Sequence, residues 1–213
     1  MSKEIHSLLT PENCTALFID FQPQMLFAVK SIEGQSLVCN AVGLAKATRL
    51  FNVPTILTTV AEESFSGPTF SQLIDVLKEQ PIDRTTMNCW EDDRVVNAVK
   101  KIGRKKLVLA GLWTEVCIVC PTIMALQEGY EVYVVADACG GTSQIAHDMA
   151  IMRMVQAGAV PVTWLQVMLE WQRDWARQAT YDGVMKIANE HGGAYGIGIQ
   201  YAKAILGKEA REG

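Results

Sequence analysis

The chain has 213 residues, of which 49% are hydrophobic and 20% are charged, a composition typical of a globular protein rather than of a disordered segment. There are 19 Lys and Arg residues against 23 Asp and Glu residues, which gives a net charge of −4. This balance excludes the strongly basic surface on which nucleic-acid-binding proteins depend, and it provides no long-range attraction for an anionic substrate.

The N-terminal segment, residues 1–6, carries charged side chains and lacks the apolar core of a secretory signal. The sequence contains no run of about 18 apolar residues, so no membrane-spanning segment and no membrane partner are predicted. Six cysteines are too few for a disulfide scaffold in a chain of this length. We therefore expect a cytoplasmic protein with reduced thiols and a single domain over residues 1–213.

Short apolar runs alternate with longer segments of helical periodicity along most of the chain. Five strands are predicted, at residues 15–20, 53–59, 106–111, 132–137 and 160–163. Helices are predicted at about residues 37–48, 69–77, 92–102, 117–128, 145–157, 165–176 and 182–190. Strands separated by helices of ten or more residues indicate βαβ units with right-handed crossovers. The predicted fold is therefore α/β, with a mostly parallel central sheet and helices on both of its faces.

A C-terminal extension is predicted from about residue 178. It contains the helix at 182–190 and then a glycine-rich stretch, residues 192–199, which is expected to be loop-like or to form an arm. The tryptophans at 164, 171 and 175 recur at helical spacing and indicate a packing or subunit-contact face. Together with the apolar residues of the tail they exceed what the sheet needs, so we expect a homo-oligomer that buries them.

Side chains suited to catalysis follow strands at one edge of the predicted sheet, where open parallel sheets bind their ligands. Asp20 ends the first strand, and Cys117 stands where the third strand turns into its helix. The dipole and free N–H groups of a helix N-terminus favour a thiolate, which makes Cys117 a candidate nucleophile. Asp20 could accept the thiol proton. A cation such as Arg84, which lies in a stretch without clear periodicity, would stabilise both anions.

Simpler interpretations and other functions remain open at this point. A cysteine at a strand–helix junction can be a buried packing residue, an aspartate that ends a strand can cap a turn, and the chain can be a catalytically silent assembly protein. Cys117 and Cys120 have C-x-x-C spacing, so the alternative function is a thiol redox or sensor protein. The three histidines are far apart and no second cysteine pair is present, so no metal site is predicted.

Several segments resemble the isochorismatase-like cysteine hydrolases, over about residues 12–165. Residues 17–22, LFIDFQ, are similar to the family's first strand, which ends in its catalytic aspartate. Residues 110–117, AGLWTEVC, are similar to its G-x-x-T-[DE]-x-C signature, and Asp137-Ala138 resembles the pair that follows. Residues 84–90 and 171–175 resemble a bacterial subgroup, the YcaC-like hydrolases.

The resemblance implies a three-layer α/β/α fold with Rossmann-like topology. It also implies a catalytic triad, which in this sequence is Asp20, Arg84 and Cys117. Arg84 stands where the family has a lysine, and an arginine cannot relay a proton as a lysine can. If this alignment is displaced, Lys78 is the nearest lysine.

The resemblance further implies a non-proline cis peptide bond between Leu112 and Trp113. The backbone amides of Trp113 and Cys117 would then form an oxyanion hole. The candidate residues of the substrate pocket are Phe21, Gln22, Trp90 and Trp113.

Nicotinamidases of this family bind a metal through a D-x-H-x-x-H segment, whereas residues 61–66 here read AEESFS. We therefore expect neither a metal nor another cofactor. The activity that the resemblance implies is hydrolysis of a small amide or carbamoyl-type molecule through a thioester intermediate. The only partners expected are that small-molecule substrate and further copies of the chain, an octamer in the resembling subgroup.

Overall fold

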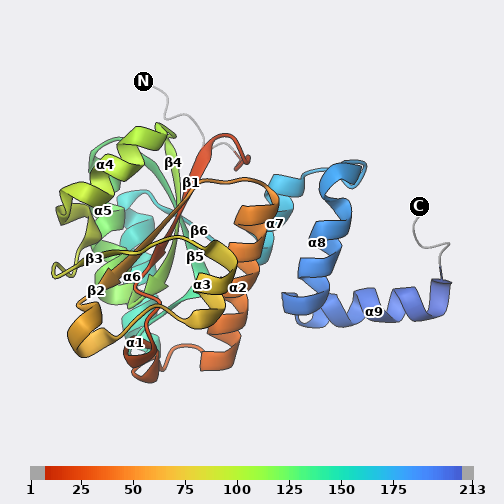
Figure 1. Cartoon of the computed structure of the whole chain (residues 1–213), viewed down its shortest axis with the longest axis horizontal. Coiled ribbons are helices and arrows are strands. Elements are labelled where there is room, and N and C mark those ends of the chain that lie inside the picture. The colour runs from red at the N-terminus through yellow and green to blue at the C-terminus, as the bar shows by residue number, and fades with distance from the viewer. Residues whose placement is uncertain (1–7, 208–213) are drawn as a thin grey trace.

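Six parallel strands form the central sheet of the computed structural model, which describes residues 8–207 (Figure 1). The strands are β1 (Cys14–Ile19), β2 (Thr55–Val60), β3 (Ile82–Arg84), β4 (Lys106–Leu112), β5 (Glu131–Gly140) and β6 (Val160–Val162). Their order is β3-β2-β1-β4-β5-β6, and each neighbouring pair is parallel. Residues 1–6, on which the prediction about a secretory signal rests, lie outside the described part of the chain.

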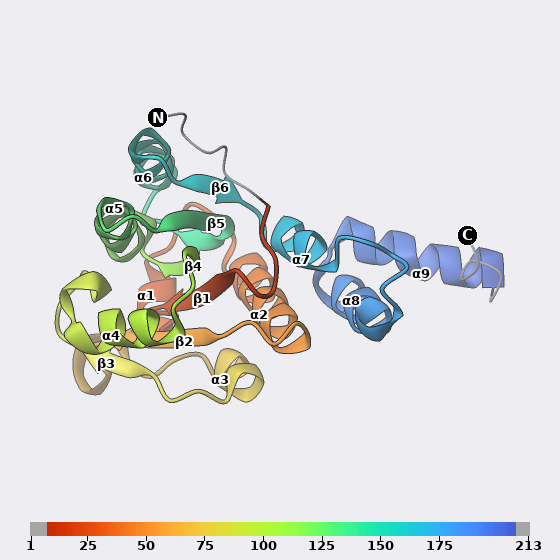
Figure 2. The same ribbon diagram turned by 90° about the horizontal axis from the view of Figure 1, so that it is seen from above.

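Helices cover both faces of the sheet, which confirms the predicted three-layer α/β/α fold (Figure 2). One face carries α2 (Gly34–Leu50), α3 (Ser71–Leu77) and α7 (Trp164–Gln172). The other face carries α4 (Asp93–Ile102), α5 (Val119–Gln127) and α6 (Gln144–Ala157). The short helix α1 (Pro23–Phe27) follows β1. Within residues 8–207, no helix combines the length and the apolar character needed to cross a membrane.

The two central strands, β1 and β4, are buried at every position, as expected for apolar strands covered on both faces. After β1, the strands β2 and β3 are added on one side of the sheet. After β4, the strands β5 and β6 are added on the other side. The strand order therefore reverses between β1 and β4. In open parallel sheets the crevice at the carboxyl ends of such strands is the usual ligand site.

All five predicted strands are present, but β3 was not predicted. It is only three residues long, its burial pattern is irregular, and a strand this short has no periodicity to detect. Its pairing with β2 is what makes it a strand, and this pairing is a tertiary effect. The predicted helix at 165–176 ends earlier, at Gln172, because Arg173 takes a left-handed φ of 59°.

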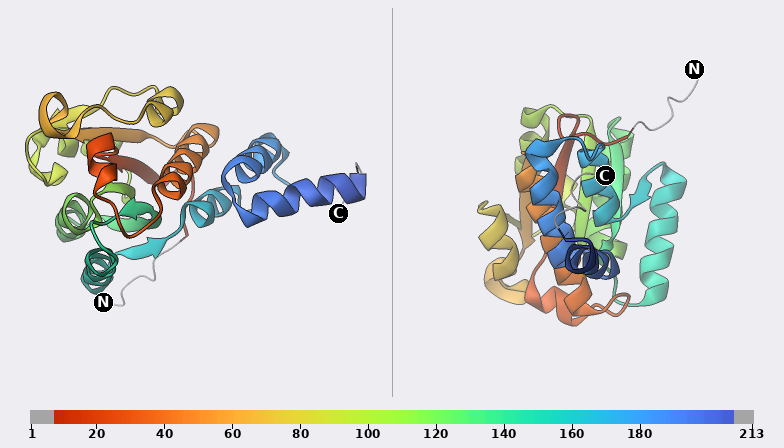
Figure 3. Two further views of the ribbon diagram at one scale, coloured as in Figure 1. Left: turned by 90° about the horizontal axis from the view of Figure 1, so that it is seen from below. Right: turned by 90° about the vertical axis from the view of Figure 1, so that its right-hand side faces the viewer.

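The C-terminal extension consists of α8 (Gln178–His191) and α9 (Ala194–Leu206). The prediction of a loop at residues 192–199 is wrong, because most of this stretch forms the first half of α9. A Cβ at Gly196 would lie 2.7 Å from the carbonyl oxygen of Asn189 and 2.8 Å from that of Ala188, so glycine here permits close packing of α9 on α8. Beyond this contact α9 extends away from the sheet (Figure 3).

Gly111 lies where β1 and β4 approach each other closely, beside the reversal of strand order. Its φ is +155°, and a Cβ there would overlap the carbonyl oxygen of Ile19 in β1. We expect Gly111→Ala to lower the free energy of unfolding by roughly 3 kcal/mol, measured by urea denaturation followed by circular dichroism. Gly129→Ala is the matched control, because Gly129 also has a positive φ, of +83°, but no atom lies within 4 Å of the position that a Cβ would take there. That control should cost about 1 kcal/mol. Equal losses in the two variants would contradict the close approach.

Candidate active site

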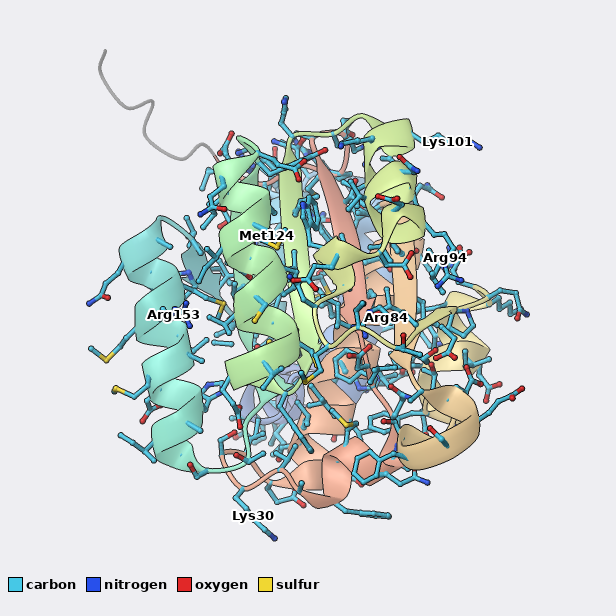
Figure 4. All side chains as sticks on the ribbon, turned by 90° about the vertical axis from the view of Figure 1, so that its left-hand side faces the viewer. Lys30, Arg84, Arg94, Lys101, Met124 and Arg153 are labelled. Carbon is cyan, nitrogen blue, oxygen red and sulfur yellow. The ribbon has the colours of Figure 1, made fainter. Side chains whose placement is uncertain are left out.

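Two of the candidate catalytic residues meet where the strand order reverses. Asp20 directly follows β1, and the π-helical turn η3 (Thr114–Ile118), which carries Cys117, follows β4. The last residue of β1, Ile19, pairs with Gly111 near the end of β4, so the two segments leave the sheet at the same height. Arg84 is the last residue of β3, on the far side of β2 (Figure 4).

The other polar groups of the site contact the carboxylate of Asp20. Its side chain is fully buried, and its φ of 56° is a left-handed conformation that non-glycine residues rarely adopt. The Thr58 hydroxyl donates a hydrogen bond to Oδ1 at 3.2 Å, and the Cys117 thiol lies close enough to the carboxylate to lower the pKa of that group. The backbone N–H of Asp20 also bonds the carbonyl of Thr58, at 3.0 Å. These contacts hold the carboxylate in one orientation toward the sulfur.

Arg84 supplies the positive charge beside Asp20. Its Nη2 donates to both carboxylate oxygens, at 3.0 Å and 2.8 Å, and its Nη1 donates to the carbonyl of Thr86 at 2.7 Å. Both side chains of this ion pair have zero exposure, so neither charge is stabilised by water and each depends on the other. The other candidate cation, Lys78, lies at the C-terminal end of α3 and is absent from the contacts of Asp20.

Cys117 is 2% exposed and lies in the π-helical turn that precedes α5, not in the first turn of an α-helix. The peptide bond between Leu112 and Trp113 is cis. The backbone amide of Trp113 lies close enough to the sulfur of Cys117 to lower the pKa of the thiol, so one of the two amides expected in the oxyanion hole lies beside the candidate nucleophile.

The structure corrects the expectation of a resting thiolate. Burial raises the pKa of the Cys117 thiol well above its ordinary value, and the negative charge of Asp20 and the hydrogen bond to it raise that pKa further. Arg84 and the Trp113 amide oppose this effect but do not reverse it. Burial also raises the pKa of the Asp20 carboxyl group, against the opposing effect of Arg84. At neutral pH the sulfur therefore keeps its proton, which faces a carboxylate of increased basicity.

Two further residues of the site were not identified from the sequence. Thr58 is an inner residue of β2, and nothing in its sequence context distinguishes it from other strand threonines. Cys89 is fully buried near the Arg84 guanidinium, and burial raises the pKa of its thiol to about 12 against the opposing effect of that positive charge. Both residues reach the site through strand pairing and loop packing, for which the sequence carries no local signal.

Three of the predicted pocket residues have packing or hydrogen-bond partners in the structure. Phe21 is fully buried between Phe18 and Phe70, with ring centroids 6.1 Å and 6.0 Å away. Gln22 uses its side-chain amide to bond the backbone of Val60 and Gly67, which fixes the segment after β2.

Trp90 donates its indole N–H to Glu128 at 2.8 Å, and Glu128 follows the end of α5 that is remote from Cys117. These contacts satisfy the polar groups of Gln22 and Trp90. Trp113 is the candidate whose backbone lies beside Cys117. It is partly exposed, and its indole donates to the carbonyl of Met25 at 2.7 Å.

All six cysteines are free thiols in the structure, including Cys117 and Cys120. Cys120 lies in the first turn of α5 and is partly exposed. Among residues 8–207, no group of three or more His, Cys, Asp and Glu side chains is arranged to hold a metal ion.

Comparison with known proteins finds one family model, the Isochorismatase domain, which matches residues 14–166. "Probable hydrolase YcaC" of Escherichia coli is 36% identical over 185 residues, covering 86% of this chain and 88% of that protein. The solved structure of E. coli YcaC, described as an octameric hydrolase of unknown specificity, matches with a TM-score of 0.90 and 34% identity, over 95% of this chain and 100% of that one. YcaC from Pseudomonas aeruginosa with hexane-2,5-diol and covalent acrylamide matches with a TM-score of 0.88 and 35% identity, over 93% and 98% of the two chains.

The charges around Cys117 lead to opposite expectations for two variants. Asp20→Asn removes the negative charge that raises the pKa of the thiol and leaves Arg84 in place, so the thiolate fraction at neutral pH should increase. We expect the pH midpoint of Cys117 alkylation by acrylamide to lie about one pH unit lower in this variant than in the wild type. Arg84→Met removes the opposing cation and should raise that midpoint, whereas Arg84→Lys should remain close to the wild type. Peptide mapping by mass spectrometry over a pH series gives the rates. A midpoint in Asp20→Asn at or above that of the wild type would contradict the assignment of a protonated resting thiol.

Proposed function

The chain belongs to the isochorismatase family of hydrolases and resembles its YcaC members, and from this we propose that it is a cysteine-dependent hydrolase of a small amide or carbamoyl-type substrate. The observation that carries the proposal is the buried contact of Asp20 with both Arg84 and the Cys117 thiol. This arrangement brings together a nucleophile (Cys117), a base (Asp20) and a fixed cation (Arg84) in one buried cluster.

In the proposed reaction the Cys117 sulfur attacks the substrate carbonyl carbon while Asp20 accepts the thiol proton. The carbon–nitrogen bond then breaks, Asp20 returns that proton to the leaving nitrogen, and the acyl group remains on sulfur as a thioester. Asp20 next takes a proton from water, whose oxygen attacks the thioester, and the proton returns to sulfur as the acid leaves. The net change is the addition of one water across the carbon–nitrogen bond, with the enzyme regenerated.

The raised pKa values of Asp20 and Cys117 suit this sequence of proton transfers. A carboxylate with an ordinary pKa is a weak base for a thiol, and burial reduces that mismatch from the Asp20 side. Arg84 keeps its proton, because the Asp20 carboxylate raises the pKa of the guanidinium. Its proposed role is to orient Asp20 and to stabilise the negative charge that passes between carboxylate and sulfur.

The negative charge on the substrate oxygen needs donors that are already in position. We assign this role to the backbone amides of Trp113 and Cys117. The closeness of the Trp113 amide to the sulfur supports the assignment, because a carbon bonded to that sulfur would carry its oxygen close to the same N–H. No metal takes part in the proposed mechanism, and the six free thiols fit the reducing cytoplasm.

We also propose that the chain is a homo-oligomer, and α9 supports this. Ile197, Tyr201 and Ile205 follow one another at four-residue intervals along α9 and are 69%, 67% and 63% exposed. Such a row on a projecting helix is unfavourable in water unless another surface covers it. The octameric state described for YcaC of E. coli agrees with self-association. Of the two interpretations of the tryptophan face, packing within the chain holds for Trp164 and Trp171, which are buried, whereas Trp175 is 46% exposed.

Ammonia release from a panel of small primary amides tests the hydrolase and its roles. Cys117→Ala should abolish turnover of any substrate found, and Asp20→Asn should reduce it by about 10²–10⁴-fold because the general base is lost. Cys120→Ser is the matched control and should retain activity, since the mechanism uses one thiol. Loss of activity with either cysteine would instead support a dithiol function.

Self-association is tested by light scattering at micromolar concentration. We expect a mass several times the 23.5 kDa of one chain. Tyr201→Glu should lower that mass, because a charge placed in the exposed row of α9 opposes its burial. A wild-type species of 23.5 kDa would contradict the oligomer.

A further inference from the structure

A second exposed apolar row lies on α6, away from both the active site and α9. Ile145, Met149 and Met152 are 64%, 48% and 53% exposed, although they are large apolar side chains. Their spacing of four and three residues places them on one side of the helix. Ala150 and Met154, on the other side, are buried against the sheet.

The row cannot be covered by the C-terminal extension of the same chain. Figure 2 shows α6 beside β6 at one end of the layered body, whereas α8 and α9 extend from the opposite side. A single self-contact through α9 would therefore leave α6 in water. Oligomers larger than a dimer commonly use more than one contact surface, because joining pairs into a closed assembly requires a second one.

The sequence of α6 has the pattern of a short paired helix. Ile145, Met149, Met152 and Gln156 follow the four–three–four spacing of the inner positions of a heptad. Two exposed, oppositely charged residues flank this seam: Asp148 precedes Met149, and Arg153 follows Met152. Figure 4 shows Arg153 on α6 at the edge of the molecule. In a parallel helix pair, such flanking positions of one helix face the opposite flank of the other, five residues further along.

We propose that α6 binds α6 of a second copy of this chain, in parallel across a two-fold axis. The apolar seam of Ile145, Met149 and Met152 would be buried at this contact. Asp148 of each chain would form an ion pair with Arg153 of the partner subunit, so the two-fold axis generates the pair twice. The proposal rests on the self-association proposed above and identifies a second surface for it.

The charges favour a second copy over an unrelated partner as the occupant. The surface carries one acid and one base on opposite flanks of the seam, five residues apart, so in a parallel pair each acid faces the base of the other helix and the surface is complementary to itself under two-fold rotation. Within one chain the Asp148 carboxylate accepts a hydrogen bond from Gln144 at 2.9 Å, one turn earlier on the same helix. That contact keeps the carboxylate on the flank of the seam.

Charge exchange provides the test, with native mass spectrometry and light scattering of the full chain over a dilution series. Asp148→Arg and Arg153→Asp should each raise the concentration at which the assembly dissociates by about tenfold, because like charges then meet across the two-fold axis. The double variant Asp148→Arg/Arg153→Asp should restore the wild-type behaviour. Met149→Glu should weaken the assembly without rescue. Lys101→Glu, an exposed reversal on α4, is the control and should change nothing.

Unchanged dissociation in Asp148→Arg, Arg153→Asp and Met149→Glu would overturn the α6 contact while leaving self-association through α9 intact. Weakening in both single variants without rescue in the double variant would overturn the parallel pairing. A monomeric wild type would instead contradict the oligomer itself. Circular dichroism and urea denaturation of each variant separate these outcomes from a failure to fold.

Discussion

The buried ion pair between Asp20 and Arg84 is the interaction on which the organisation of the site depends. Neither charge reaches water, so each is tolerable only while the other is held against it. Arg84 reaches Asp20 from β3 across the end of β2, which requires β3 to pair with β2 and Thr58 to complete the carboxylate's hydrogen bonds. Gln22 fixes the segment after β2 by bonding the backbone at Val60 and Gly67. The segments that follow the strands thus bury Asp20, Arg84 and Cys117 together at this edge of the sheet.

The burial of this site also determines the protonation state of Cys117. A helix N-terminus in water favours a thiolate, but the desolvation of Cys117 and the adjacent carboxylate outweigh that effect and keep the proton on sulfur. In the proposed mechanism, activation of Cys117 then depends on proton transfer at the moment of attack, not on a pre-formed anion. An arginine suits this arrangement, because it stays charged while the proton moves between its two neighbours.

The alternation of strands and helices and the positions of Asp20 and Cys117 could be predicted from the sequence, because periodicity and strand ends are local features. β3 could not, since three residues have no period and only pairing with β2 defines them. α9 was missed because its glycines suggest a loop, whereas Gly196 serves close helix packing. The hydrogen-bond partners of Trp90 and Gln22 could not be predicted either, because these partners are distant in sequence.

The central claim is that Cys117 rests as a protonated thiol beside the Asp20 carboxylate. A pH titration of the ¹³Cβ resonance of Cys117, assigned with Cys117→Ser in selectively labelled protein, measures its protonation directly. The account predicts that this resonance stays at its thiol position through pH 9.0, the ordinary pKa of a cysteine, and begins to titrate at lower pH in Asp20→Asn. A wild-type midpoint near or below pH 7 would show a resting thiolate and would contradict the account.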